Sequence, residues 1–125
     1  MVKITTFDSI DAPSTSGSSL KGYLNYGITY YDLVKLLGEP TFLPEDSGDG
    51  KVNFEWVVEF DNGEGYIETF TIYDWKTESP EWSRLNTGSF EQAKEWFGSR
   101  WHVGGKGYAG TFINFIDEKA SEKVA

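Results

Sequence analysis

The stretch from Lys51 to Lys76 contains two runs of alternating apolar and polar residues, joined by the turn-forming sequence Asp-Asn-Gly-Glu-Gly at 61–65. A period of two is typical of a half-buried strand, because successive side chains of a strand point to opposite faces of the sheet. The joining residues tolerate positive φ, so the stretch is predicted to form a β-hairpin. The predicted apolar face of its first strand is Val52, Phe54, Trp56, Val58 and Phe60.

The second run of the hairpin alternates less cleanly. Phe70 and Ile72 suit one face, whereas Ile67, Tyr73 and Trp75 have the opposite parity. We therefore expect both faces of this strand to be partly covered, or one of them to be a binding surface.

Residues 29–38 carry complete helix start and stop signals. Thr29 is a suitable N-cap, with Asp32 at the capping-box position, and Gly38 followed by Pro40 ends the helix. Two further helices are predicted, one from Ser89 to Gly98 and one from Tyr108 to about Lys119. The apolar stripe predicted for the first helix is Tyr30, Leu33, Val34 and Leu37.

The order of these elements indicates an α+β fold. We expect an antiparallel sheet of three to four strands around the central hairpin, packed against two to three helices. The expected organisation is an arm or loop over 1–18, with a short strand around Ile4 and Phe7 as an alternative, one domain over 19–119, and a frayed tail over 120–125. Residues 20–24 and 100–103 are further candidates for short strands.

Charge and composition narrow the functional classes. The 125 residues include 20 acidic and 11 basic ones, a formal net charge of −9. Direct binding to nucleic acid is not expected, because it requires basic side chains that neutralise phosphates. The acidic excess is explained either by solubility, the more general reason, or by a face that docks on a basic partner.

The absence of cysteine is typical of a reducing compartment and excludes thiolate metal ligands. No apolar run reaches the length of a signal-peptide core or of a membrane span. We therefore expect a cytoplasmic protein that does not bind membranes.

No residue pattern indicates catalysis, a cofactor or a metal. His102 is the single histidine and has no ligand or nucleophile partners at recognisable spacing, which favours a structural role. The glycine-rich run 104–107 precedes a helix and lies near Arg100 and Lys106, where backbone N–H groups and cations can hold an anion. It matches neither a Walker A loop nor a dinucleotide fingerprint, so a simple tight turn is favoured.

Two sets of candidate binding residues remain. Carboxylates beside aromatic side chains on the hairpin suit either the solvated face of a sheet or a protein-contact patch. The predicted protein-binding residues are Glu55, Glu59, Tyr73, Asp74 and Trp75. The alternative ligand-binding set, for a nucleotide held by stacking and phosphate capture, is Arg100, Trp101, His102, Lys106 and Tyr108.

Several motifs in a fixed order resemble a family of small uncharacterised bacteriophage proteins. They run from about residue 19 to residue 118, with a longer segment at 77–99 that departs from the pattern. The helix-Gly-x-Pro-strands portion, residues 29–75, is also topologically similar to the β-lactamase-inhibitor-protein-like fold. The motifs are SLKGY at 19–23, YDLV at 31–34, LGEP at 37–40, EW at 55–56, TIYDWK at 71–76 and WHVGG at 101–105.

The phage resemblance implies a context rather than a set of functional residues. Small acidic phage proteins often bind and block host machinery, so it implies a non-enzymatic inhibitor in the host cytoplasm. The expected partner is a host protein with a basic surface, with an antiviral-defence effector (an anti-CRISPR-like role) as a candidate. The alternative function is a sponge for a nucleotide second messenger of host defence. A homodimer through the Tyr- and Trp-rich sheet is also compatible with the sequence.

Overall fold

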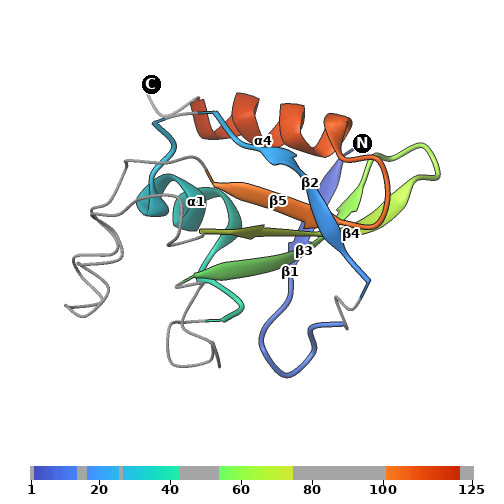
Figure 1. Ribbon diagram of the computed structural model, residues 1–125, viewed down its shortest axis with the longest axis horizontal. Helices are drawn as coiled ribbons and strands as arrows, with labels where there is room; N and C mark the ends of the chain where they lie inside the picture. The colour runs from blue at the N-terminus through green and yellow to red at the C-terminus, as the bar shows by residue number, and fades with distance from the viewer. Residues whose placement is uncertain (1, 14–16, 26, 43–53, 75–100, 122–125) are drawn as a thin grey trace.

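The computed structural model describes residues 2–13, 17–25, 27–42, 54–74 and 101–121. These residues form a five-stranded antiparallel sheet in the order β1-β3-β4-β5-β2 and two helices (Figure 1). The fold is α+β as predicted, with five strands instead of three to four. The elements are β1 (Lys3–Thr6), β2 (Ser19–Tyr23), α1 (Tyr30–Leu37), β3 (Glu55–Asp61), β4 (Ile67–Tyr73), β5 (His102–Gly105) and α4 (Gly110–Ser121).

The predicted hairpin is present as β3 and β4, which pair over seven residues from Glu55–Tyr73 to Asp61–Ile67. The turn is held by its own side chains: Asp61 Oδ1 accepts from the Gly63 N–H, and Asn62 Oδ1 accepts from the Glu64 and Tyr66 N–H groups. These Asx-type bonds satisfy the turn backbone locally.

The first strand explains the additional width of the sheet. Residues 3–6 of the predicted arm pair with β3, so Ile4 lies opposite Phe60 and Thr6 opposite Val58. Past the end of β1, Phe42 pairs with Glu55 of β3 in an isolated bridge. The short-strand alternative for this segment is therefore the observed one.

Helix α1 forms as its capping signals predict. The Thr29 hydroxyl accepts from the Asp32 N–H at 3.0 Å, and the Asp32 carboxylate accepts from the Thr29 N–H at 2.9 Å. Gly38 ends the helix with φ of 88°, a conformation that glycine adopts without strain. The predicted second helix over 89–98 lies outside the described residues.

The segment before α4 differs from the prediction. Gly104 and Gly105 belong to β5 and pair with both β4 and β2, so they are not turn residues. The chain turns at 106–109, and α4 begins at Gly110 instead of Tyr108. Glycine is required in β5 because a Cβ on Gly105 would lie 2.7 Å from the Phe70 ring.

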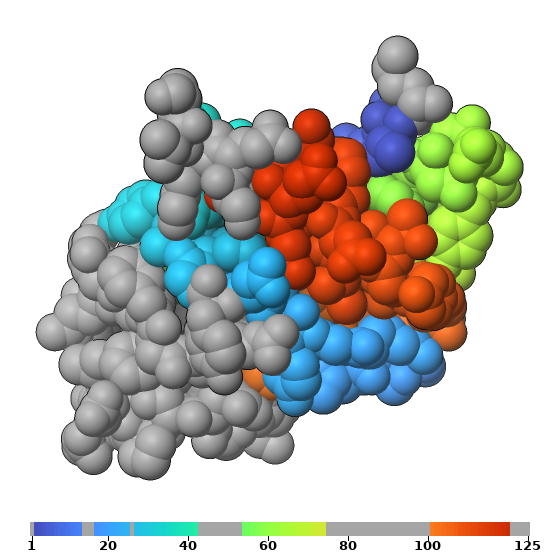
Figure 2. Space-filling model, turned by 90° about the horizontal axis from the view of Figure 1, so that it is seen from above, coloured from blue at the N-terminus to red at the C-terminus, as the bar shows by residue number. Residues whose placement is uncertain are grey.

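Both helices cover the same face of the sheet. Seen from the α4 side, α4 and β2 lie next to each other (Figure 2). Gly22 of β2 leaves room for Ile113 of α4, because a Cβ on Gly22 would lie 2.8 Å from Ile113 Cδ1. The core between helices and sheet is mainly aromatic, and Phe70 stacks on Phe112 with ring centroids 4.6 Å apart. The buried core residues include Tyr30, Leu33, Phe54, Trp56, Val58, Phe60, Phe70, Ile72, Trp101, Val103, Phe112 and Ile116.

Candidate functional site

Four titratable side chains form a row across the sheet face that points away from the helices. The strand register places Glu55 opposite Tyr73, Tyr73 opposite His102, and His102 opposite Tyr23. Their neighbours Trp56, Ile72 and Val103 have the opposite parity and lie in the core. We call Glu55, Tyr73, His102 and Tyr23 the polar row.

His102 occupies the middle of the polar row and is buried. Its ring lies edge-on to Tyr23 at 4.9 Å and tilted against Tyr73 at 5.3 Å, measured between centroids. The Nδ1 atom is buried and forms no hydrogen bond, although the side chain has other interactions. Burial between two aromatic rings agrees with the structural role expected for this histidine.

The next row of residues on the same face has smaller and more apolar side chains. Val57 lies opposite Thr71, which lies opposite Gly104, and Val57 and Thr71 are buried. Gly104 leaves the space that its neighbours fill, because a Cβ there would lie 2.8 Å from Thr71 Oγ1 and 3.3 Å from Tyr73 Cε1. The Tyr73 ring thus approaches β5 at Gly104, where that strand carries no side chain.

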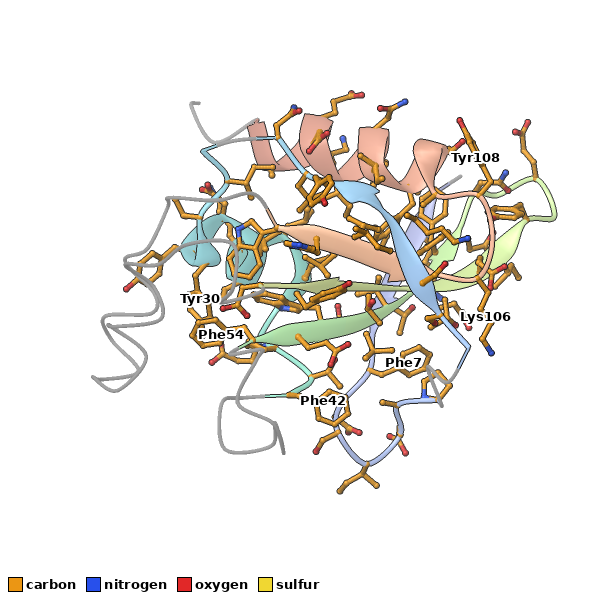
Figure 3. The ribbon with its side chains drawn as sticks, in the orientation of Figure 1. Phe7, Tyr30, Phe42, Phe54, Lys106 and Tyr108 are labelled. Carbon is orange, nitrogen blue, oxygen red and sulfur yellow. The ribbon has the colours of Figure 1, made fainter. Side chains whose placement is uncertain are left out.

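Thr41 fixes the segments beside β3. Its hydroxyl donates to the Phe7 carbonyl at 2.7 Å and accepts from the Val57 N–H at 2.9 Å. Phe7 and Phe42 lie on the side of the sheet away from α4 (Figure 3). Two aromatic side chains therefore border the β3 edge of the face that carries the polar row.

Glu55 is the electrostatically unfavourable member of the polar row. Burial, and secondly the neighbouring carboxylate of Asp74, raise the pKa of Glu55 above its ordinary value. Burial also raises the pKa of Tyr73, with further contributions from Glu55 and then Tyr23. Burial and neighbouring groups thus disfavour the ionised forms of Glu55 and Tyr73.

The structure does not place all of the predicted protein-binding residues on one face of the sheet. Glu55 and Glu59 share the face away from the helices, as the alternation of the first strand predicts, and Tyr73 lies on the same face opposite Glu55. Asp74 has the opposite parity, and its Oδ1 accepts from the Phe54 N–H at 2.8 Å, so it fixes the end of the β3–β4 pair. Trp75 lies outside the described residues.

The alternative ligand-binding set does not form one site in the part of the chain that the structure describes. Trp101 lies on the core side, where its Nε1 donates to the Ile28 carbonyl at 2.7 Å. His102 is in the polar row, while Lys106 and Tyr108 lie beyond the other end of β5 (Figure 3). Arg100 lies outside the described residues. Gly104 and Gly105 pair with strands on both sides, so these two residues form neither the tight turn that was favoured nor the alternative anion-binding turn.

The residues that sequence reasoning missed are Tyr23, Phe7, Thr41 and Phe42. Tyr23 joins the polar row through pairing with His102, which is distant in the chain, and no local pattern specifies that register. The one available signal was the aromatic residue at the end of the predicted strand 20–24.

Among the described residues, no group of three or more histidine, aspartate or glutamate side chains is placed to hold a metal ion. No helix in this same part of the chain combines the length and apolarity needed to cross a membrane. The chain matches no protein-family model, no curated protein and no solved structure. The resemblance to phage proteins and to the β-lactamase-inhibitor-protein-like fold therefore stays a hypothesis from sequence.

Proposed function

We propose that this chain is a small acidic, non-enzymatic binding protein of phage origin that blocks a host macromolecule. A host protein with a basic surface, such as an effector of antiviral defence, is the proposed partner. The supporting observation is that Glu55, Glu59 and Tyr73 share the face opposite the two described helices, with Tyr73 directly opposite Glu55. Aromatic anchors beside charged groups are typical of protein-binding surfaces.

The net charge of −9 supports a basic partner, since opposite charges accelerate encounter and disfavour acidic competitors. The nucleotide-sponge alternative has less support, because its described residues lie in three separate places.

Affinity capture from a lysate of the bacterial host tests the proposal. The wild-type protein should retain a stoichiometric partner, and the complex should weaken as salt is raised. Glu55→Gln combined with Glu59→Gln should reduce capture, because it removes two charges from the proposed face.

The matched control is Glu64→Gln combined with Glu118→Gln, which makes the same change of charge at exposed positions in the hairpin turn and on α4. Equal loss of capture in both double variants would show that net charge, and not this face, attracts the partner. Retention of no partner would contradict the proposed function.

A further inference from the structure

The carboxylate of Glu55 stands between two aromatic residues in the same row of the sheet. Phe42 is its bridge partner on one side, and Tyr73 is its register partner on the other. Directly opposite residues of antiparallel pairs place their side chains on the same face. The three residues come from separate segments that only the fold brings together.

The hydrogen-bond pattern shows which of the two neighbours is nearer. The N–H and C=O groups of Glu55 both bond to Phe42, at 3.1 and 2.9 Å. They therefore point away from β4, and Glu55 and Tyr73 form a non-hydrogen-bonded pair. In such pairs the opposed Cα atoms are about 4.5 Å apart instead of about 5.5 Å, which brings the side chains closer. The side chains of Glu55, Tyr73 and Phe42 thus share one face of the sheet, and the Glu55–Tyr73 pair has the shorter backbone separation.

The surroundings of Glu55 disfavour a negative charge on its carboxylate. The groups that act on Glu55 are its half-buried surroundings and a second carboxylate, Asp74, and both disfavour its negative charge. The pair of carboxylates is too small a ligand set for a calcium ion, which takes six to eight oxygen atoms. An organic cation needs a single carboxylate for its charge and aromatic surfaces for its flat or apolar parts.

We propose that Phe42, Glu55 and Tyr73 form a subsite for one arginine side chain of a partner protein. Arginine suits the subsite better than lysine, because its planar guanidinium stacks on aromatic rings, binds carboxylates in bidentate geometry and loses water more readily. The inference rests on the proposed function and makes it specific: the sheet face receives an arginine-bearing segment of the partner.

The subsite can be tested without the partner by titrating the full-length protein with a capped Gly-Arg-Gly peptide, followed by two-dimensional NMR. The amide signals of residues 42, 55 and 73 should shift most. A capped Gly-citrulline-Gly peptide, which keeps the shape and lacks the charge, should bind at least tenfold more weakly. A capped Gly-Lys-Gly peptide should bind more weakly than the arginine peptide.

Glu55→Gln should weaken binding of the arginine peptide about tenfold, whereas Glu59→Gln, on the same strand and face, should leave it within about twofold. Tyr73→Leu provides a second test, because it keeps the carboxylate and removes the ring. Equal binding of the arginine and citrulline peptides, or no effect of Glu55→Gln, would overturn the subsite.

The failure of the subsite and of the proposed function can be distinguished. Capture of a host partner that depends on the Glu55 and Glu59 pair, without selective binding of the arginine peptide, would reject the subsite alone. Selective peptide binding without any captured partner would support the subsite and reject the blocking function.

Discussion

The indole Nε1 of Trp101 donates a hydrogen bond of 2.7 Å to the carbonyl oxygen of Ile28, which joins the start of β5 to the segment before α1. Both residues are buried, so water cannot replace the donor if the indole is removed. Trp56 makes the equivalent bond to the carbonyl of Gly38, which is an exposed residue. The two tryptophans thus present the same bond in two different environments.

Trp101→Phe should therefore destabilise the protein more through its lost hydrogen bond than Trp56→Phe does. An acceptor left buried without a donor costs about 1–3 kcal/mol. The two variants remove the same atoms, so the free energies of unfolding in urea can be compared directly. A smaller loss for Trp101→Phe than for Trp56→Phe would contradict the expected role of the buried carbonyl.

The reciprocal cap of α1 predicts an energetic coupling. Thr29→Ala removes the hydroxyl that accepts from the Asp32 N–H and should cost about 1 kcal/mol. Asp32→Ala removes the returning bond, and the two changes should not be additive because each side chain helps to fix the other. A double-mutant cycle measured by chemical denaturation checks this, and strictly additive losses would disprove the coupling.

Gly105→Ala tests the close approach of β5 and β4. The added Cβ would lie 2.7 Å from the Phe70 ring, which is itself stacked on Phe112. Overpacking of this kind costs about 1–3 kcal/mol. Thermal unfolding should show the loss, and Phe70→Leu in the same chain should recover part of it. A neutral single variant would mean that the ring can move.

The local elements were predictable because their signals lie within a few residues. The cap at Thr29, the stop at Gly38 and the alternation through Trp56 and Phe60 each specify a conformation from neighbouring residues alone. The same alternation placed Glu55 and Glu59 on the face of β3 that points away from the core. These predictions needed no knowledge of how the strands are ordered.

The errors came from contacts between distant residues. The pairing of Gly104 with both Thr71 and Leu20 turns a glycine-rich segment into a strand, although glycine has low strand propensity. Glycine is favoured at position 104 because the side chains of Thr71 and Tyr73 fill the space that a Cβ would need. The pairing of Tyr23 with His102 likewise depends on a register between segments far apart in the chain, so the polar row could not be predicted from sequence.

Glu55 gives the prediction that links stability to the proposed site. Its pKa is raised in the folded protein, so the folded state keeps the proton to a higher pH than the unfolded chain does. The contribution of this group to stability is therefore largest at acidic pH and decreases as pH rises through the folded pKa. Asp74 acts on Glu55 from the end of β4, Tyr73 lies directly opposite it, and His102 and Tyr23 lie further along the polar row.

Glu55→Gln resembles the protonated acid in shape and cannot ionise. The variant should gain stability over the wild type at neutral pH, and the gain should diminish toward acidic pH, where the wild-type side chain is also neutral. Thermal unfolding of both proteins across this range measures the difference. Glu59→Gln removes the same formal charge from the same strand and face, so an equal, pH-dependent gain in that variant would attribute the effect to net charge. A stabilised Glu55→Gln variant that no longer binds the arginine peptide would show that the free protein retains an unfavourable carboxylate because its ligand needs it.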